Sequence, residues 1–141
     1  MIEVLNFGTA KQQLEVTKRF YKISDESIST INKVIGAGIV PKFVEFLQSY
    51  NINLQIVAAC VLGNIAAGDI FHVKCIIDAG ALPALVKLLS SPSENVQEHA
   101  VWCLGNIACN GSECRDLLLD HGVLSPLLQS VNKLVCFFFL V

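Results

Sequence analysis

Apolar residues recur at three- and four-residue spacings through much of the chain, which is the pattern of one buried face of an α-helix. The stretch Glu94–Ala108 shows this most clearly, because a projection at about 100° per residue gathers its apolar side chains on one side. That face consists of Val96, Ala100, Cys103, Leu104 and Ile107. Ser93 directly precedes the stretch and is expected to cap the N-terminus of the helix.

The pattern repeats along the chain with a fixed period of about 42 residues. Gly38–Pro41 corresponds to Gly80–Pro83, and Ala58–Ala66 corresponds to Ala100–Ala108 with Leu-Gly-Asn-Ile-Ala unchanged. Each unit contains a short helix that ends at glycine, a second helix with proline in its first turn, and a longer third helix. Three helices in a repeat of this length are the armadillo pattern.

We therefore expect an all-α fold, a right-handed α-solenoid of armadillo repeats that forms a single domain over residues 1–141. The predicted units are a partial repeat at 9–24, repeats at 27–67 and 70–109, a partial repeat at 112–131 and an atypical apolar tail at 132–141. Within the second complete repeat, helices are predicted over 71–79, 82–89 and 94–108. The tail stands where a polar turn and another long helix are expected, so we interpret the chain as a fragment or truncated product.

Composition narrows the function classes. The chain is 53% apolar and 16% charged, and its net charge of −2 gives no support for a nucleic-acid partner. The longest apolar run, Leu134–Val141, is far shorter than the span of about 20 residues that a bilayer requires. The first residues, Met1–Val4, lack the basic and apolar runs of a signal peptide, so we expect reduced cysteines and a location in the cytoplasm and nucleus.

A second stripe of residues lies beside the apolar face of the predicted third helices. It consists of Asn95, His99, Trp102 and Asn106 in one unit, and of Asn53, Val57, Cys60 and Asn64 in the unit before it. Stacking the repeats would align Asn64 with Asn106, and an asparagine amide can both donate to and accept from the backbone of an extended peptide. Trp102 would add a flat wall whose π-face attracts Lys or Arg by about 0.5–2 kcal/mol.

Each of these residues also has a purely structural interpretation. Trp102 could be a packed core residue, and Asn64 and Asn106 could hydrogen-bond to local backbone at the ends of their helices. The recurrence of asparagine at one phase of successive repeats favours a binding surface.

Four segments of the chain resemble importin-α, the armadillo-repeat adaptor of nuclear import. They are Gly38–Leu47, Leu88–Ser91, Val96–Ala108 and Cys114–Leu119, and the resemblance runs from about Lys11 to Gln129. In that family, Trp-x-x-x-Asn arrays line a concave groove that binds nuclear localisation signals as extended, lysine-rich strands. The resemblance implies such a role for five positions. They are Trp102 and Asn106 as one array, Glu98 as an attractor of basic side chains, Asn64 as part of the preceding array, and Gly68 with its backbone facing the ligand.

The departures from the family pattern fall on the same surface. Cys60 replaces the tryptophan of the first array, and Asn110 replaces an aspartate that pairs with the key lysine of the signal. Asn110 keeps hydrogen bonding but not the charge, and a charge-assisted bond is roughly twice as strong as a neutral one. His99 and Val73 replace polar residues. The family's basic importin-β-binding segment has no counterpart after Met1, so coupling to importin-β is not expected.

Three functions remain to be compared. The first is an adaptor that binds Lys/Arg-rich nuclear localisation signals, requires no cofactor and catalyses no reaction. The second is an interaction scaffold or interfering isoform without cargo, which could self-associate through its open repeat ends. The third is an enzyme or metal site. Its candidate ligands are His99, Cys103, Cys109, Cys114 and His121, whose spacing matches no usual zinc pattern.

Overall fold

The computed structural model describes residues 1–130, and this part of the chain contains helices and no strands. The helices are α1 Ile2–Phe7, α2 Ala10–Glu26, α3 Ile28–Gly36, α4 Val40–Phe46, α5 Ile52–Ala66, α6 Ile70–Asp78, α7 Ala81–Leu88, α8 Glu94–Ala108 and α9 Ser112–Asp120. Residues 124–130 are also helical. The predicted tail at 132–141 lies outside the described residues.

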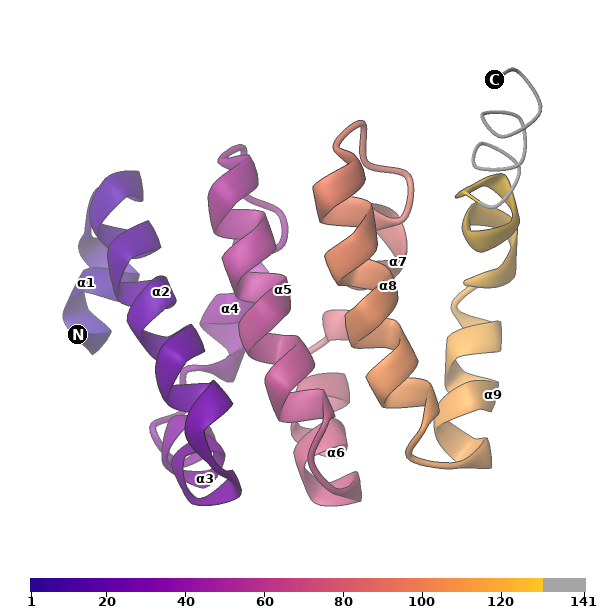
Figure 1. Ribbon diagram of the computed structural model, residues 1–141, viewed down its shortest axis with the longest axis horizontal. Coiled ribbons are helices and arrows are strands. Elements are labelled where there is room, and N and C mark those ends of the chain that lie inside the picture. The colour runs from indigo at the N-terminus through magenta and orange to yellow at the C-terminus, as the bar shows by residue number, and fades with distance from the viewer. Residues whose placement is uncertain (131–141) are drawn as a thin grey trace.

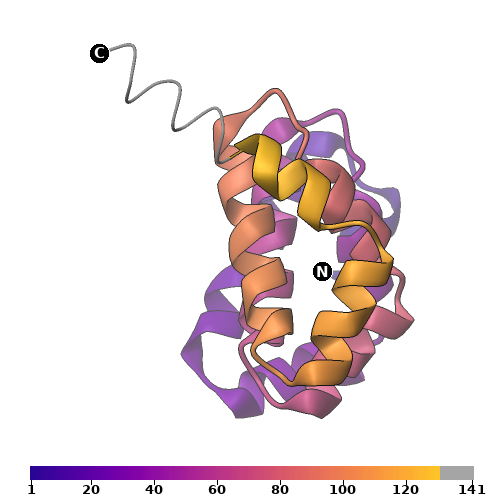
Figure 2. The ribbon, with the colours of Figure 1, turned by 90° about the vertical axis from the view of Figure 1, so that its right-hand side faces the viewer.

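The three long helices α2, α5 and α8 stand side by side in a row along the long axis of the molecule (Figure 1). Helix α5 packs against both α2 and α8, so it is the centre of this row. The shorter helices form the opposite side of the stack, as the view along the long axis shows (Figure 2). The expected all-α armadillo solenoid is thereby confirmed.

The predicted helices agree with the structure to within two residues at each end. The long helix predicted at 94–108 is α8, and the shorter ones predicted at 71–79 and 82–89 are α6 and α7. The backward extension of the repeat to 9–24 corresponds to α2. Hydrophobic periodicity alone could predict these helix bounds because each helix buries one continuous apolar face against its neighbours.

Ser93 occupies the N-cap position of α8, but its side chain makes no capping hydrogen bond. The preceding turn is held instead by Gln97, whose Nε2 donates to the carbonyl oxygen of Ser91. The equivalent glutamines of the two preceding repeats make the same kind of bond, from Gln55 to Leu47 at 3.1 Å and from Gln13 to Leu5 at 3.0 Å. A glutamine near the start of each long helix therefore links the helix to the preceding segment by a side-chain hydrogen bond to a backbone carbonyl oxygen.

The core lies between the row of long helices and the row of short ones. The predicted apolar face of α8 is buried throughout, including Val96, Cys103 and Ile107. Ala58 of α5 and Ala100 of α8 are fully buried. Their small side chains permit neighbouring helices to pack closely. None of the helices in residues 1–130 is long and apolar enough to cross a membrane.

Candidate peptide-binding surface

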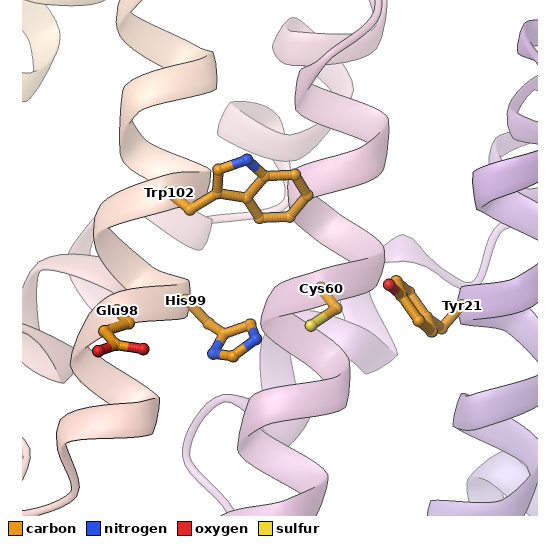
Figure 3. Close-up of a pocket in the computed structure, with 5 residues that line it drawn as sticks. All are labelled: Tyr21, Cys60, Glu98, His99 and Trp102. Atoms are coloured by element: carbon orange, nitrogen blue, oxygen red, sulfur yellow. The ribbon is translucent and has the colours of Figure 1, made fainter.

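Trp102 lies on the backbone of the neighbouring repeat. Its indole reaches from α8 toward α5 (Figure 3) and occupies the space that a side chain at Gly63 would need. A Cβ at position 63 would collide with Cζ3, Cε3 and Cη2 of the indole, the farthest of which would be 2.9 Å away. Because Trp102 is still 43% exposed, one side of the ring is packed and the rest is available to a ligand.

A pocket of about 320 Å³ opens beside this ring. It is lined by Trp102, Glu98 and His99 of α8, by Cys60 of α5 and by Tyr21 of α2 (Figure 3). The carbonyl oxygen of Asn95 accepts a hydrogen bond from Nδ1–H of His99 at 2.7 Å, which leaves Nε2 as the ring nitrogen that can face a ligand. The pocket thus combines two aromatic rings, one carboxylate and one imidazole from three successive long helices.

The structure brings three of the predicted site residues together in this pocket: Trp102, Glu98 and His99. Tyr21 was not predicted. A signal for it was present, because Tyr21 stands one full repeat before Gly63 and therefore occupies the same place in its unit.

The asparagines connect successive repeats. Nδ2 of Asn106 donates to the carbonyl oxygen of Gly63 at 3.0 Å, and Nδ2 of Asn64 donates to Oγ of Ser24 at 3.0 Å. Nδ2 of Asn110 donates to the carbonyl oxygens of Ala66 at 3.3 Å and Asn106 at 3.1 Å. Asn64 and Asn106 therefore bond to the preceding repeat and not, as the purely structural interpretation expected, to the local backbone of their own helices.

The oxygen of each amide remains available. Within residues 1–130, Oδ1 of Asn64, Asn106 and Asn110 receives no hydrogen bond, and no buried side-chain nitrogen or oxygen lacks a partner. These three oxygens therefore keep access to solvent, where they can accept from the N–H groups of a bound backbone.

A second cavity of about 240 Å³ lies between α2, α3 and α5. It brings together Asn64, Gly68 and the carboxylate of Asp25. Gly68 also has a packing role, since a Cβ there would lie 2.5 Å from Nδ1 of the buried His72 ring.

Cys60 of the pocket and Cys103 of the core are neutral thiols at physiological pH. Burial raises the pKa of the Cys60 thiol to about 11. Burial, with a further contribution from nearby Cys60, raises the pKa of Cys103 to about 12. Because the thiolate is the form that binds metals and attacks electrophiles, both thiols behave as unreactive, apolar groups. Among residues 1–130, no three His, Cys, Asp or Glu side chains are grouped so that they could hold a metal ion.

Comparison with known proteins assigns this architecture to a class. The model for the Armadillo/beta-catenin-like repeat matches residues 30–67 and 72–109. Among solved structures, a designed armadillo repeat protein in complex with the peptide (KR)4 superposes with a TM-score of 0.87 at 32% identity, over 91% of this chain and 54% of that chain. The chain therefore belongs to the armadillo-repeat family.

Curated proteins that are similar to this chain are importin-α subunits, the family that the sequence motifs resemble. Importin subunit alpha-1 of Schizosaccharomyces pombe is 54% identical over 134 residues, which are 94% of this chain and 25% of that protein. Importin subunit alpha-1b of Oryza sativa subsp. japonica is 46% identical over 135 residues, again 94% of this chain and 25% of that protein. The chain thus spans about a quarter of the length of these relatives.

Proposed function

We propose that this chain binds Lys/Arg-rich nuclear localisation signals as extended peptides along the face formed by α2, α5 and α8, as an importin-α-like import adaptor. The observation that carries the proposal is the Trp102 ring, which packs on Gly63 with 43% of its surface exposed and Glu98 in the same pocket. An aromatic face beside a carboxylate favours a basic side chain over a neutral one. The likeness to a designed protein in complex with (KR)4 supports the same ligand class.

The peptide backbone would run along the asparagines. Asn64 and Asn106 are anchored to the preceding repeat through Nδ2, so their Oδ1 atoms are held in place before the ligand arrives. Such preorganisation favours binding because less conformational entropy is lost. The ligands would be proteins that carry basic nuclear localisation signals, and binding would take place in the cytoplasm and nucleus. The proposal does not include coupling to importin-β.

We expect the affinity to be low. Asn110 offers no negative charge, and Cys60 offers no tryptophan ring at the preceding array position. The attraction that remains depends on the exposed carboxylate of Glu98, so binding should weaken as salt screens that charge.

Fluorescence anisotropy with a labelled (Lys-Arg)4 peptide at low salt tests the proposal. Saturable binding that Trp102→Ala reduces and Tyr50→Ala preserves would support it, because Tyr50 is a fully exposed aromatic residue outside both cavities. Circular dichroism must show that each variant is helical. A folded wild-type protein that does not bind the peptide saturably would refute the proposed function.

One observation favours a second function, that of a self-associating scaffold. Leu117 and Leu119 of α9 and Leu124 and Leu128 of the following helical segment are each more than a third exposed. Exposed leucines on one end of a stack favour contact with another apolar surface. Sedimentation velocity over a range of concentrations tests this function, and a monomer at every concentration would exclude it.

A further inference from the structure

Each contact between successive long helices pairs one large residue with one small residue. The helix that carries the large residue differs between the two contacts. Where α5 meets α8, the large residue is Trp102 on the later helix and the small residue is Gly63 on the earlier one. One repeat earlier, where α2 meets α5, the corresponding pair is Cys60 on the later helix and Tyr21 on the earlier one. The aromatic residue has moved from one side of the interface to the other.

The contact between Trp102 and Gly63 explains why these two changes occur together. The indole at 102 occupies the space that a Cβ at 63 would fill. Tyr21 places both a Cβ and a ring at the corresponding position of α2, so a tryptophan at 60 would collide with it. Cys60 is small enough to leave room, and both residues line one pocket.

The exchange leaves aromatic rings on both sides of α5. Trp102 reaches toward α5 from α8, Tyr21 reaches toward it from α2, and Cys60 lies between them (Figure 3). Tyr21 is 38% exposed and Trp102 is 43% exposed, so neither ring is sealed in the core. Of the five lining residues, Glu98 is a carboxylate and none is Lys or Arg.

We infer that Tyr21 supplies from α2 the aromatic face that Cys60 lacks, and that the pocket binds one Lys or Arg side chain between Tyr21 and Trp102 with its charge near Glu98. This inference rests on the proposed function and identifies one subsite of it. A neutral thiol on the floor of the pocket suits the aliphatic stem of such a side chain, while the cationic group needs the rings and the carboxylate. The specificity determinant of the first array is then residue 21 and not residue 60.

Lysines on α2 define where this subsite ends. Lys18 and Lys22 stand one repeat before Cys60 and Asn64, so α2 presents positive charge where the later helices present a thiol and an amide. Lys18 is paired with Glu15 at 2.8 Å, and Lys22 is exposed. A basic peptide is therefore expected to place its last basic side chain at Tyr21 and to continue no further along α2.

The first experiment measures binding of the labelled (Lys-Arg)4 peptide to Tyr21→Leu and Tyr21→Phe. Leucine keeps bulk at position 21 and removes the π-face, whereas phenylalanine keeps the face, so the pair separates space filling from cation recognition. Tyr21→Leu should weaken binding by about 2- to 30-fold, the range of a cation–π contact, and Tyr21→Phe should bind like the wild type.

The outcomes separate this inference from the proposed function. If Tyr21→Leu binds like the wild type while Trp102→Ala loses affinity, the Tyr21 inference is wrong and the proposed function stands. If the folded wild type does not bind at all, both are wrong.

The second experiment tests the size exchange without a ligand. Cys60→Trp should lower the thermal midpoint, and adding Tyr21→Gly should restore much of the loss, because the double variant recreates the Trp102–Gly63 arrangement between α2 and α5. Tyr21→Gly alone corrects for the cost of glycine in a helix. If Cys60→Trp is equally destabilising whether tyrosine or glycine stands opposite it, the two positions are independent and the inference fails.

Discussion

Gly63 contacts two side chains of the following repeat, Trp102 and Asn106. The indole of Trp102 packs on its Cα, and Nδ2 of Asn106 donates to its carbonyl oxygen at 3.0 Å. One backbone position of α5 therefore orients the ring and the amide of α8 together. The arrangement requires a residue without a Cβ, although glycine in the middle of a helix costs about 0.5–1 kcal/mol relative to alanine.

Gly63→Ala should displace the Trp102 ring and abolish most peptide binding. The gain in helix propensity is outweighed by overpacking of about 1–3 kcal/mol, so the free energy of unfolding should fall by about 1 kcal/mol. Urea denaturation measures the stability. Because the chain has a single tryptophan, its intrinsic fluorescence reports the displacement of Trp102 directly.

Gly105→Ala is the matched control. Gly105 is the counterpart of Gly63 in the next repeat, in the middle of α8, and within residues 1–130 no atom beyond the adjoining backbone of its own helix lies within 4 Å of the place of its Cβ. Alanine there should stabilise the fold by about 0.5–1 kcal/mol and leave the fluorescence of Trp102 unchanged. Equal effects of the two substitutions would show that Trp102 does not depend on Gly63.

The sequence was sufficient for the helices and for much of the candidate surface. Glu94–Ala108 could be assigned because its apolar face is continuous, and Trp102 and His99 could be placed on one stripe because helical geometry is regular. Glu98 was predicted only through the resemblance to importin-α. Tyr21 was missed, since its correspondence to Gly63 can be read from the repeat but has a meaning only when the direction of the Trp102 ring is known. That direction depends on packing across repeats, which no single-helix projection contains.

Hydrogen bonds across repeats escaped prediction for the same reason. Asn64, Asn106 and Asn110 each donate to a group of the preceding repeat. A local pattern shows only that an amide lies on a given side of its helix. Whether the amide bonds to its own helix, the adjacent repeat or a ligand depends on the spacing between helices.

Asn106→Ala should lower both stability and affinity. Loss of the bond to Gly63 should reduce the free energy of unfolding by about 0.5–1.5 kcal/mol, and peptide binding should weaken because an acceptor for its backbone is removed. Asn95→Ala serves as a control for stability alone, because Asn95 is an exposed residue of the same helix but lies on the same candidate stripe. Denaturant titration of both variants makes the comparison, peptide anisotropy compares Asn106→Ala with the wild type, and an Asn106→Ala protein as stable as Asn95→Ala would argue against the bond to Gly63.

Asn110→Asp should strengthen peptide binding and weaken the fold. The added carboxylate attracts Lys and Arg, with a benefit that declines as salt concentration rises. However, Asn110 donates to the carbonyl oxygens of Ala66 and Asn106, and a carboxylate would face both without a proton to give. Its charge would also lie just beyond the C-terminus of α8, where the helix dipole disfavours anions.

Both effects of Asn110→Asp can be measured on one preparation. We expect affinity for (Lys-Arg)4 at low salt to rise several-fold and the free energy of unfolding to fall by about 1–2 kcal/mol. The gain in affinity should disappear at high salt. A gain that is independent of salt would mean that the new carboxylate acts through something other than its charge.

Cys60 should react slowly with alkylating reagents, and a bound peptide should slow it further. Burial raises the pKa of this thiol to about 11, so at pH 8 only about one molecule in a thousand carries the reactive thiolate. Deprotonation increases with pH, so the rate should rise about tenfold per pH unit until it levels off near pH 11.

Iodoacetamide pulses followed by mass spectrometric mapping measure the rate at each cysteine, with the exposed Cys109 as the internal reference. Since Cys60 lies between Tyr21 and Trp102, saturating (Lys-Arg)4 should protect it and leave Cys109 unaffected. If Cys60 is modified as fast as Cys109 at pH 8, or is not protected by a peptide that binds, the thiol does not form the floor of the occupied pocket.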